Sequence, residues 1–95
     1  MNFQDLQEKR DEILAIAAKH GALNVRVFGS VVRGEATPES DVDFLIDLGE
    51  KRSPWFPTGL IRDLESLLGR KVDVVTERSV HYFIRDQILR EAKPL

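Results

Sequence analysis

Two aspartates one residue apart, Asp41 and Asp43, are the strongest chemical signal in the sequence. They lie in the segment 41–47, whose alternating apolar residues predict a β-strand. Because successive side chains of a strand point to opposite faces, both carboxylates share one face, roughly 6.6 Å apart along the chain. Carboxylates this close repel each other unless a cation lies between them, and hard oxygen ligands suit Mg²⁺. The pair therefore predicts a divalent-metal site on the face opposite the apolar residues.

A third carboxylate, Asp73, is expected to join this pair. It lies in the predicted strand 72–76, with a pleat phase opposite to that of the flanking valines. If this strand lies beside the first, about 4.8 Å away, Asp73 faces the same cleft as Asp41 and Asp43. Two-metal phosphoryl-transfer sites hold their ions roughly 3.5–4 Å apart, a separation that such carboxylates can bridge. We therefore expect Asp73 to bind one of two metal ions and to accept a proton from an attacking hydroxyl group.

Gly29 and Ser30 lie at the end of another predicted strand, with ten residues between Ser30 and Asp41. A glycine lets the backbone approach a ligand closely, and free N–H groups at such a turn attract phosphate oxygens. Ser30 adds a hydroxyl donor, and Arg33 can present its guanidinium to the phosphates or to leaving pyrophosphate. Ser40 can orient the loop or donate to a phosphate. Together these residues predict a site for a nucleoside triphosphate and Mg²⁺.

Hydrophobic periodicity indicates the elements that position these residues. It predicts a helix at about 5–20, strands at 24–28 and 41–47, a helix at 58–68, a strand at 72–76 and a final helix after Ser79. Thr58 and Ser79 are the expected N-caps of the two later helices. This order indicates an α/β (α+β) fold, with a small mixed sheet of about three or four strands flanked by helices. We expect residues 1–95 to form one domain.

Composition excludes several other classes of protein. Apolar residues make up 42% and charged residues 32%, which is typical of a folded domain and argues against disorder. The net charge of -2 does not indicate a nucleic-acid or anionic-membrane surface. Without cysteine, disulfides and thiolate metal sites are excluded, and a cytoplasmic location is expected. No apolar run approaches the roughly 18 residues of a membrane span, and the first residues lack a signal-peptide pattern.

The run Gly-Ser-Val-Val-Arg-Gly at 29–34, followed by Ser-Asp-Val-Asp-Phe-Leu at 40–45, resembles the signature of the polymerase-beta-like nucleotidyltransferase superfamily. Within it, the chain is most similar to the minimal nucleotidyltransferases, many of which pair with HEPN-domain proteins as toxin–antitoxin modules. The resemblance covers nearly the whole chain, from the first helix through the Asp73 strand to a final helix that ends Arg90-Glu91-Ala92. One departure is Val-Val at 31–32, where relatives often carry a polar or basic residue.

This resemblance implies a nucleotidyltransferase fold and Mg²⁺-dependent transfer of a nucleoside monophosphate from a triphosphate, usually ATP. Antitoxins of this kind add AMP to a tyrosine of a HEPN ribonuclease and silence it. The resemblance therefore implies a protein adenylyltransferase with a HEPN-domain toxin as its partner. Carried over by position are the phosphate-binding pair Gly29 and Ser30, the motif arginine Arg33, the metal ligands Asp41 and Asp43, and the third carboxylate Asp73.

Other functions stay open on the sequence alone. The chain could neutralise a toxin by binding it, with an idle or regulatory nucleotide site. Three retained carboxylates argue against an idle site, because their mutual repulsion lowers stability when no metal is bound. Transfer to RNA or to a small molecule is a further alternative, and self-association of the chain is left open. A membrane partner is not expected.

Several residues outside the motif carry less specific signals. Trp55 and Phe56, between two prolines, are expected to fold back over the core, or else to form an exposed patch for a partner or a base-stacking lid. His20 and His81 lack partners at metal-ligand spacing and are expected to be surface or capping residues. Four basic residues predict either a solvated helix face or a docking face for an acidic partner: Arg78, Arg85, Arg90 and Lys93.

Overall fold

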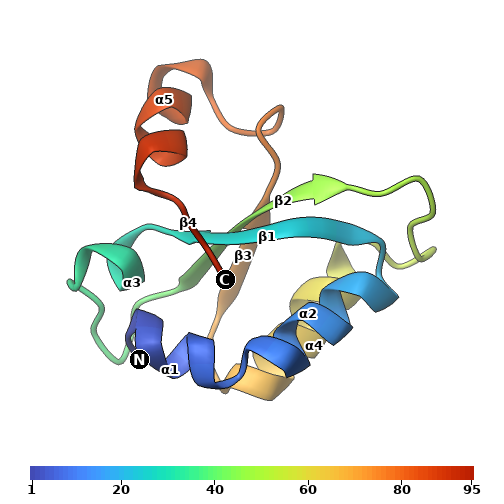
Figure 1. Ribbon diagram of the computed structural model, residues 1–95, viewed down its shortest axis with the longest axis horizontal. Helices are drawn as coiled ribbons and strands as arrows, with labels where there is room; N and C mark the ends of the chain where they lie inside the picture. The colour runs from blue at the N-terminus through green and yellow to red at the C-terminus, as the bar shows by residue number, and fades with distance from the viewer.

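The computed structural model describes residues 1–95 and contains five helices and four strands (Figure 1). In chain order the elements are α1 (Phe3–Glu8), α2 (Arg10–Lys19), β1 (Ala22–Phe28), α3 (Ser30–Arg33), β2 (Val42–Leu48), α4 (Thr58–Leu68), β3 (Val72–Val75), α5 (Tyr82–Glu91) and β4 (Lys93–Pro94). The strands form one sheet in the order β3-β2-β1-β4. No helix is long and apolar enough to cross a membrane.

The sheet is mixed, as predicted. Strand β1 runs antiparallel to both β2 and β4, whereas β2 and β3 are parallel. Parallel strands need a long connection, and α4 supplies it between β2 and β3. In this register Asp43 pairs with Asp73 on one side and with Phe28 on the other. The topology therefore places the end of β1 and two aspartates next to one another.

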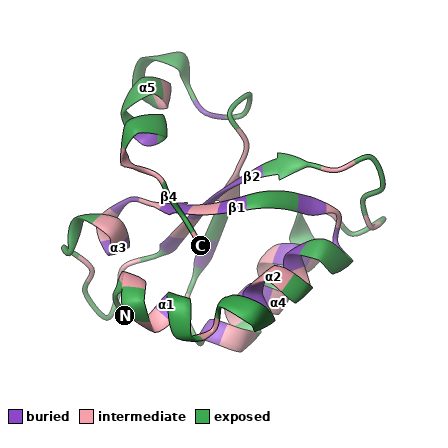
Figure 2. Cartoon of the chain, in the orientation of Figure 1, coloured by how far each residue is buried: buried purple, intermediate pink, exposed green.

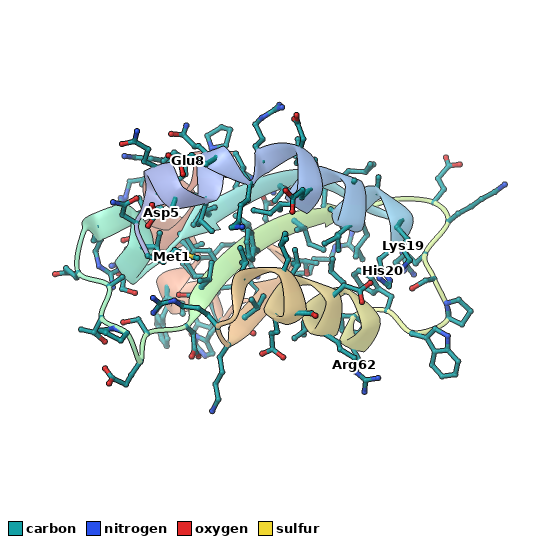
Figure 3. All side chains as sticks on the ribbon, turned by 90° about the horizontal axis from the view of Figure 1, so that it is seen from below. Met1, Asp5, Glu8, Lys19, His20 and Arg62 are labelled. Atoms are coloured by element: carbon teal, nitrogen blue, oxygen red, sulfur yellow. The ribbon has the colours of Figure 1, made fainter.

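Helices α1, α2 and α4 cover one face of the sheet, where the main core forms (Figures 1 and 3). The alternating residues of β2 that were predicted to face the core are all buried in this layer: Val42, Phe44 and Ile46. Helix α4 buries leucines at helical spacing against them: Leu60, Leu64 and Leu68. The core is thus made by the periodic residues that the sequence pattern identifies.

Helix α5 lies on the opposite face of the sheet, where a second, smaller cluster forms (Figure 1). Leu45 has the same pleat phase as Asp43, yet it is fully buried with Val80 and Ile88. The expectation that the aspartate face lies away from core packing is therefore only half right. The final helix covers part of that face, so that Asp43 lies beside a buried cluster.

The first predicted helix is divided into α1 and α2. The backbone leaves helical geometry at Lys9, with φ -104° and ψ 14°, and its N–H bonds to the carbonyl of Leu6 at 3.0 Å. Helix α1 begins with a capping box, in which the side chains of Asn2 and Asp5 each accept the other's backbone N–H. Leu6 in α1 and Ile13 in α2 are both fully buried, so each piece anchors itself in the core.

The two predicted helix caps are wrong. Thr58 is the first residue of α4, and Pro57 occupies the cap position without a side-chain hydrogen bond. Ser79 belongs to a turn in which its Oγ accepts the Thr76 N–H at 2.9 Å, so its hydroxyl is already engaged before the helix begins. His81 caps α5 instead and accepts the N–H of Phe83 at 3.2 Å, which agrees with the expectation of a surface or capping residue.

Candidate active site

The aspartates of the motif lie on neighbouring parallel strands. Asp43 is in β2 and pairs in register with Asp73 in β3, while Asp41 directly precedes β2. Because paired residues of adjacent strands point to the same face, the carboxylates of Asp43 and Asp73 project from one side of the sheet. Asp43 is half-buried, whereas Asp41 and Asp73 are exposed. The structure therefore places Asp43 and Asp73 side by side on neighbouring strands, with Asp41 two residues before Asp43, and Asp43 is the most buried of the three.

The position of Asp43 disfavours the negative charge on its carboxylate. Burial, followed by the charges of Asp73 and Asp41, raises the pKa of Asp43 to about 6. The nearby guanidinium of Arg33 opposes this rise only in part. Ionised Asp43 is thus less stable than an isolated carboxylate, and a cation beside it would compensate for the neighbouring charges.

The donor set at this place fits Mg²⁺, because it consists of carboxylate oxygens that concentrate negative charge. The side chains are not preassembled, since no three Asp, Glu, His or Cys residues lie close enough together to form a ready metal-binding group. An ion at this place would therefore have to draw the carboxylates together.

Gly29 brings the backbone against Asp43. It has φ +82°, a conformation that residues with a side chain rarely adopt, and it joins the end of β1 to α3. A Cβ atom at this position would lie 2.2 Å from Oδ2 of Asp43, which is a steric clash. Glycine is therefore required here both by the turn and by the close approach of the carboxylate.

Glu91 is the residue that sequence reasoning missed. Its Oε2 accepts the backbone N–H of Gly29 at 2.7 Å, and its Oε1 accepts a hydrogen bond from Nη1 of Arg33, also at 2.7 Å. Its side chain is only 13% exposed. One carboxylate from the end of α5 thus occupies two of the donors that were expected to hold phosphate, the Gly29 N–H and Arg33.

Arg33 is held by two carboxylates. Its Nε donates to Oε1 of Glu35 at 2.5 Å, in addition to the bond with Glu91. These bonds to Glu35 and Glu91 raise the pKa of Arg33 above its ordinary value, so the guanidinium stays charged. In this arrangement the arginine fastens α5 to the turn after β1, and a phosphate would have to compete for it.

The two serines of the motif occupy different environments. Ser30 is the first residue of α3, beside Gly29, and its side chain is half-buried. Ser40 Oγ accepts the N–H of Thr37 at 2.9 Å and lies 3.2 Å from the Thr37 hydroxyl. Of the two roles considered for Ser40, these contacts favour orientation of the loop that leads into Asp41.

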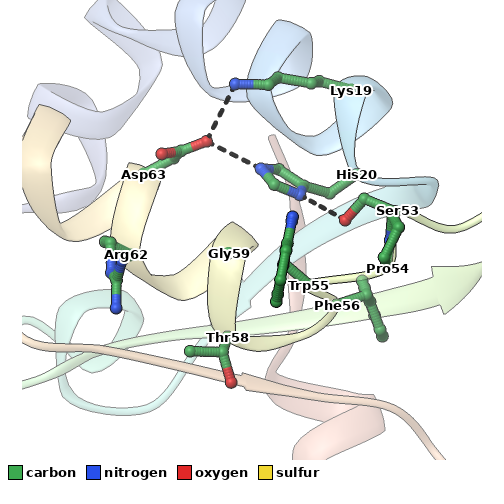
Figure 4. Close-up of a pocket in the computed structure, with 10 residues that line it drawn as sticks. All are labelled: Lys19, His20, Ser53, Pro54, Trp55, Phe56, Thr58, Gly59, Arg62 and Asp63. Atoms are coloured by element: carbon green, nitrogen blue, oxygen red, sulfur yellow. Dashed lines mark hydrogen bonds and ion pairs between the residues drawn. The ribbon is translucent and has the colours of Figure 1, made fainter.

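A cavity of about 670 Å³ lies elsewhere, around the end of α2, the start of α4 and the loop before it (Figure 4). His20 lines this cavity. It is the C-cap of α2, which agrees with the capping alternative of the prediction, but its side chain is buried and does not lie on the surface. Its Nδ1 is hydrogen-bonded to Oγ of Ser53 and its Nε2 to Oδ2 of Asp63, each at 2.8 Å. Those partners satisfy both ring nitrogens, which makes burial of the imidazole favourable.

Trp55 and Phe56 behave differently from each other beside this cavity. Phe56 packs against the core, whereas Trp55 is 75% exposed. None of the aspartates of the motif lines the cavity. We therefore place the candidate site by its chemistry, at the aspartates and Gly29, and not by the size of the hollow.

Known proteins with a similar sequence are named after nucleotidyl or adenylyl transfer. A family model described as the nucleotidyltransferase domain matches residues 10–95. A protein of Methanocaldococcus jannaschii, named as a candidate protein adenylyltransferase, is 39% identical over 92 residues, which are 97% of this chain and 96% of that protein. The protein adenylyltransferase MntA of Thermococcus cleftensis is 44% identical over 73 residues, which are 77% of this chain and 74% of that protein.

Solved structures with a similar fold also include nucleotidyltransferases. One described as a candidate minimal nucleotidyltransferase matches with a TM-score of 0.84 and 46% identity, over 100% of this chain and 97% of that one. A toxin–antitoxin complex with AMP-PNP shares the fold alone, with a TM-score of 0.72 and 22% identity, over 88% of this chain and 69% of that one. The chain therefore belongs to the nucleotidyltransferase domain family and is a nucleotidyltransferase.

Proposed function

We propose that this enzyme transfers AMP from ATP to a hydroxyl group of a partner protein, a HEPN-domain toxin that it silences as an antitoxin. The observation that carries the proposal is the pairing of Asp43 with Asp73 across two parallel strands, with Gly29 packed against Asp43. The similarity to proteins named protein adenylyltransferases supports a protein acceptor. The resemblance of the motif to antitoxin members supports the toxin as that acceptor.

Asp41, Asp43 and Asp73 are the residues that would hold Mg²⁺, as two ions. Bound there, Mg²⁺ would neutralise charge on the triphosphate and on the departing pyrophosphate. The raised pKa of Asp43 supports this role, because a bound cation would offset the repulsion that the ionised carboxylate experiences from its neighbours. The negative charges gathered near Asp43 thus support the proposed metal requirement.

The remaining roles follow from position. Gly29 N–H, the Ser30 hydroxyl and Arg33 would bind phosphate oxygens after Glu91 releases two of these donors. Asp73, the exposed carboxylate of the pair, would accept the proton of the attacking hydroxyl. The acceptor oxygen forms a bond to the α-phosphorus, the bond from that phosphorus to the bridging oxygen breaks, and pyrophosphate leaves.

The test is incubation of the protein with ATP, Mg²⁺ and the proposed HEPN-domain partner, followed by intact-mass measurement of both chains. We expect the partner to gain the mass of one or more AMP units, and to gain none with the Asp43→Asn variant. Neutralisation of the toxin without any mass gain would show an antitoxin that acts by binding alone. Extension of added RNA, with the partner unmodified, would show an RNA acceptor.

A further inference from the structure

Helix α5 exposes an unusual amount of apolar surface. Of the seven large apolar residues that are exposed in the chain, four lie on this helix: Tyr82, Phe83, Ile84 and Leu89. We call these four residues the α5 patch. Figure 2 shows the helix mostly in the colour of exposed residues, with its buried turn against the sheet. The rings of Tyr82 and Phe83 lie against each other, with centroids 4.2 Å apart, and His81 stacks on both.

The patch is large enough to serve as part of a protein interface. Its side chains are 65%, 75%, 49% and 39% exposed in chain order. With about 200 Å² for a side chain of this size, the exposed area is roughly 450 Å². A standard interface buries about 800 Å² on each partner, so the patch supplies about half of one side. Aromatic side chains are also enriched among the residues that dominate binding energy.

The patch lies on the same side of the sheet as the candidate active site. Leu45 and Val75 follow Asp43 and Asp73 by two residues on their strands, and both pack with the cluster beneath α5. The other side of the sheet is closed by three helices (Figure 1). A macromolecule that approaches the aspartates must therefore come from the α5 side.

The same helix connects the patch to the site directly. Helix α5 has ten residues, about 15 Å in length, and begins with Tyr82. At its other end Glu91 binds the Gly29 N–H beside Asp43. A protein that rests on the first turn of α5 and extends along the helix reaches the site within one helix length.

We propose that the α5 patch is the docking surface for the protein that accepts AMP. This inference rests on the proposed function and names the surface by which the acceptor is held. The exposed charged residues on and just before α5 are of both signs, namely Glu77, Arg78, Asp86 and Arg90. The matching surface on the acceptor is therefore apolar at its centre, with charged groups of both signs at its rim.

The test compares two variants that remove equally exposed aromatic side chains. Phe83→Asp alters the patch, and Trp55→Asp is the matched control, since both residues are 75% exposed and Trp55 lies beside the cavity at the other end of the molecule. An aspartate in the first turn of a helix is compatible with the helix dipole, so Phe83→Asp should fold. Circular dichroism and ATP-analogue binding confirm that each variant is folded.

We expect Phe83→Asp to weaken binding of the proposed HEPN-domain partner at least about tenfold, as for a residue central to an interface. AMP transfer at low partner concentration should fall in parallel, while binding of the ATP analogue stays within about twofold of wild type. Trp55→Asp should match wild type in all three measurements. Unchanged partner binding by Phe83→Asp would overturn the inference, and so would an equal loss in Trp55→Asp.

Two further results separate this inference from the proposed function. Asp43→Asn should bind the partner like wild type while transferring no AMP, so docking can be verified without catalysis. If Phe83→Asp changes only the self-association of the chain in sedimentation, the patch joins two copies of the enzyme, and the acceptor-docking inference is overturned.

Discussion

Replacement of Asp43 by asparagine should stabilise the metal-free protein at neutral and alkaline pH. Burial, together with the charges of Asp73 and Asp41, raises the pKa of Asp43 from 3.8 to about 6. The folded protein therefore holds this proton more tightly than the unfolded chain does. The stabilisation that comes from protonated Asp43 is complete below pH 3.8 and is lost as the pH rises through 6. Asparagine does not ionise and avoids this loss.

The size of the effect follows from the pKa shift. A shift from 3.8 to about 6 corresponds to at most about 3 kcal/mol, at 1.36 kcal/mol for each pH unit. The side chain of Asp43 is only half-buried, and solvent screening reduces this to about 1–2 kcal/mol at pH 8. For a domain of this size, that gain corresponds to a melting temperature roughly 4–15 °C higher. Below pH 4 the difference should vanish.

The assay is urea unfolding followed by circular dichroism, in EDTA, at several values between pH 4 and pH 8. Asp47→Asn is the matched control on the same strand, because Asp47 bonds to Arg26 and Asn24 and is about half exposed. The Asp47→Asn variant should be slightly less stable than wild type at pH 8, so its change in unfolding free energy has the opposite sign to that of Asp43→Asn. The reasoning is refuted if Asp43→Asn is no more stable than wild type at pH 8, or if its gain is the same at pH 4 and pH 8.

Three further changes test the remaining features of the structure. Gly29→Ala should lose about 2–4 kcal/mol of unfolding free energy, because of the positive φ at Gly29 and the clash with Asp43. The control Gly69→Ala, at φ +65° with no atom within 4 Å, should lose only about 1–2 kcal/mol in urea unfolding, and equal losses would contradict the clash. Glu91→Gln should bind a non-hydrolysable ATP analogue roughly tenfold more tightly in calorimetry, because a competing negative charge is removed. Weaker binding would show that Glu91 contributes to binding of the nucleotide. His20→Ala should lose about 1–3 kcal/mol of stability yet keep AMP transfer by the folded protein, and a loss of transfer at full folding would assign the cavity a catalytic role.

The sequence was sufficient to predict those helices and strands in which a pattern of apolar residues recurs over several positions. Alternation along Val42, Phe44 and Ile46 predicted both a strand and its buried face. The pleat phase of Asp43 and Asp73, with one assumption about which strands are neighbours, predicted that the two carboxylates project on one side. Short elements were harder to predict: the sequence indicated a short turn or helix after Gly29, which is the four-residue α3, and the two-residue β4 escaped this reasoning.

Contacts between distant residues could not be predicted, because no local pattern encodes them. Glu91 lies 62 residues from Gly29, and no spacing rule connects a helix end to a turn that far away. The burial of His20 depends on partners 33 and 43 residues further along the chain. The failed helix cap at Ser79 has a local cause, since its hydroxyl accepts the Thr76 N–H and donates to the Thr76 carbonyl within its own turn.

The position of Glu91 also bears on how the enzyme turns over. After AMP transfer, pyrophosphate would remain bound to the donors that Glu91 holds in the free protein, the Gly29 N–H and Arg33. Because Glu91 is tethered by α5, its effective concentration at those donors is high, whatever the amount of pyrophosphate in solution. Return of this carboxylate would displace the product, and product release often limits the rate of such enzymes. The same contact that opposes binding of the nucleotide would thus protect the enzyme from inhibition by pyrophosphate.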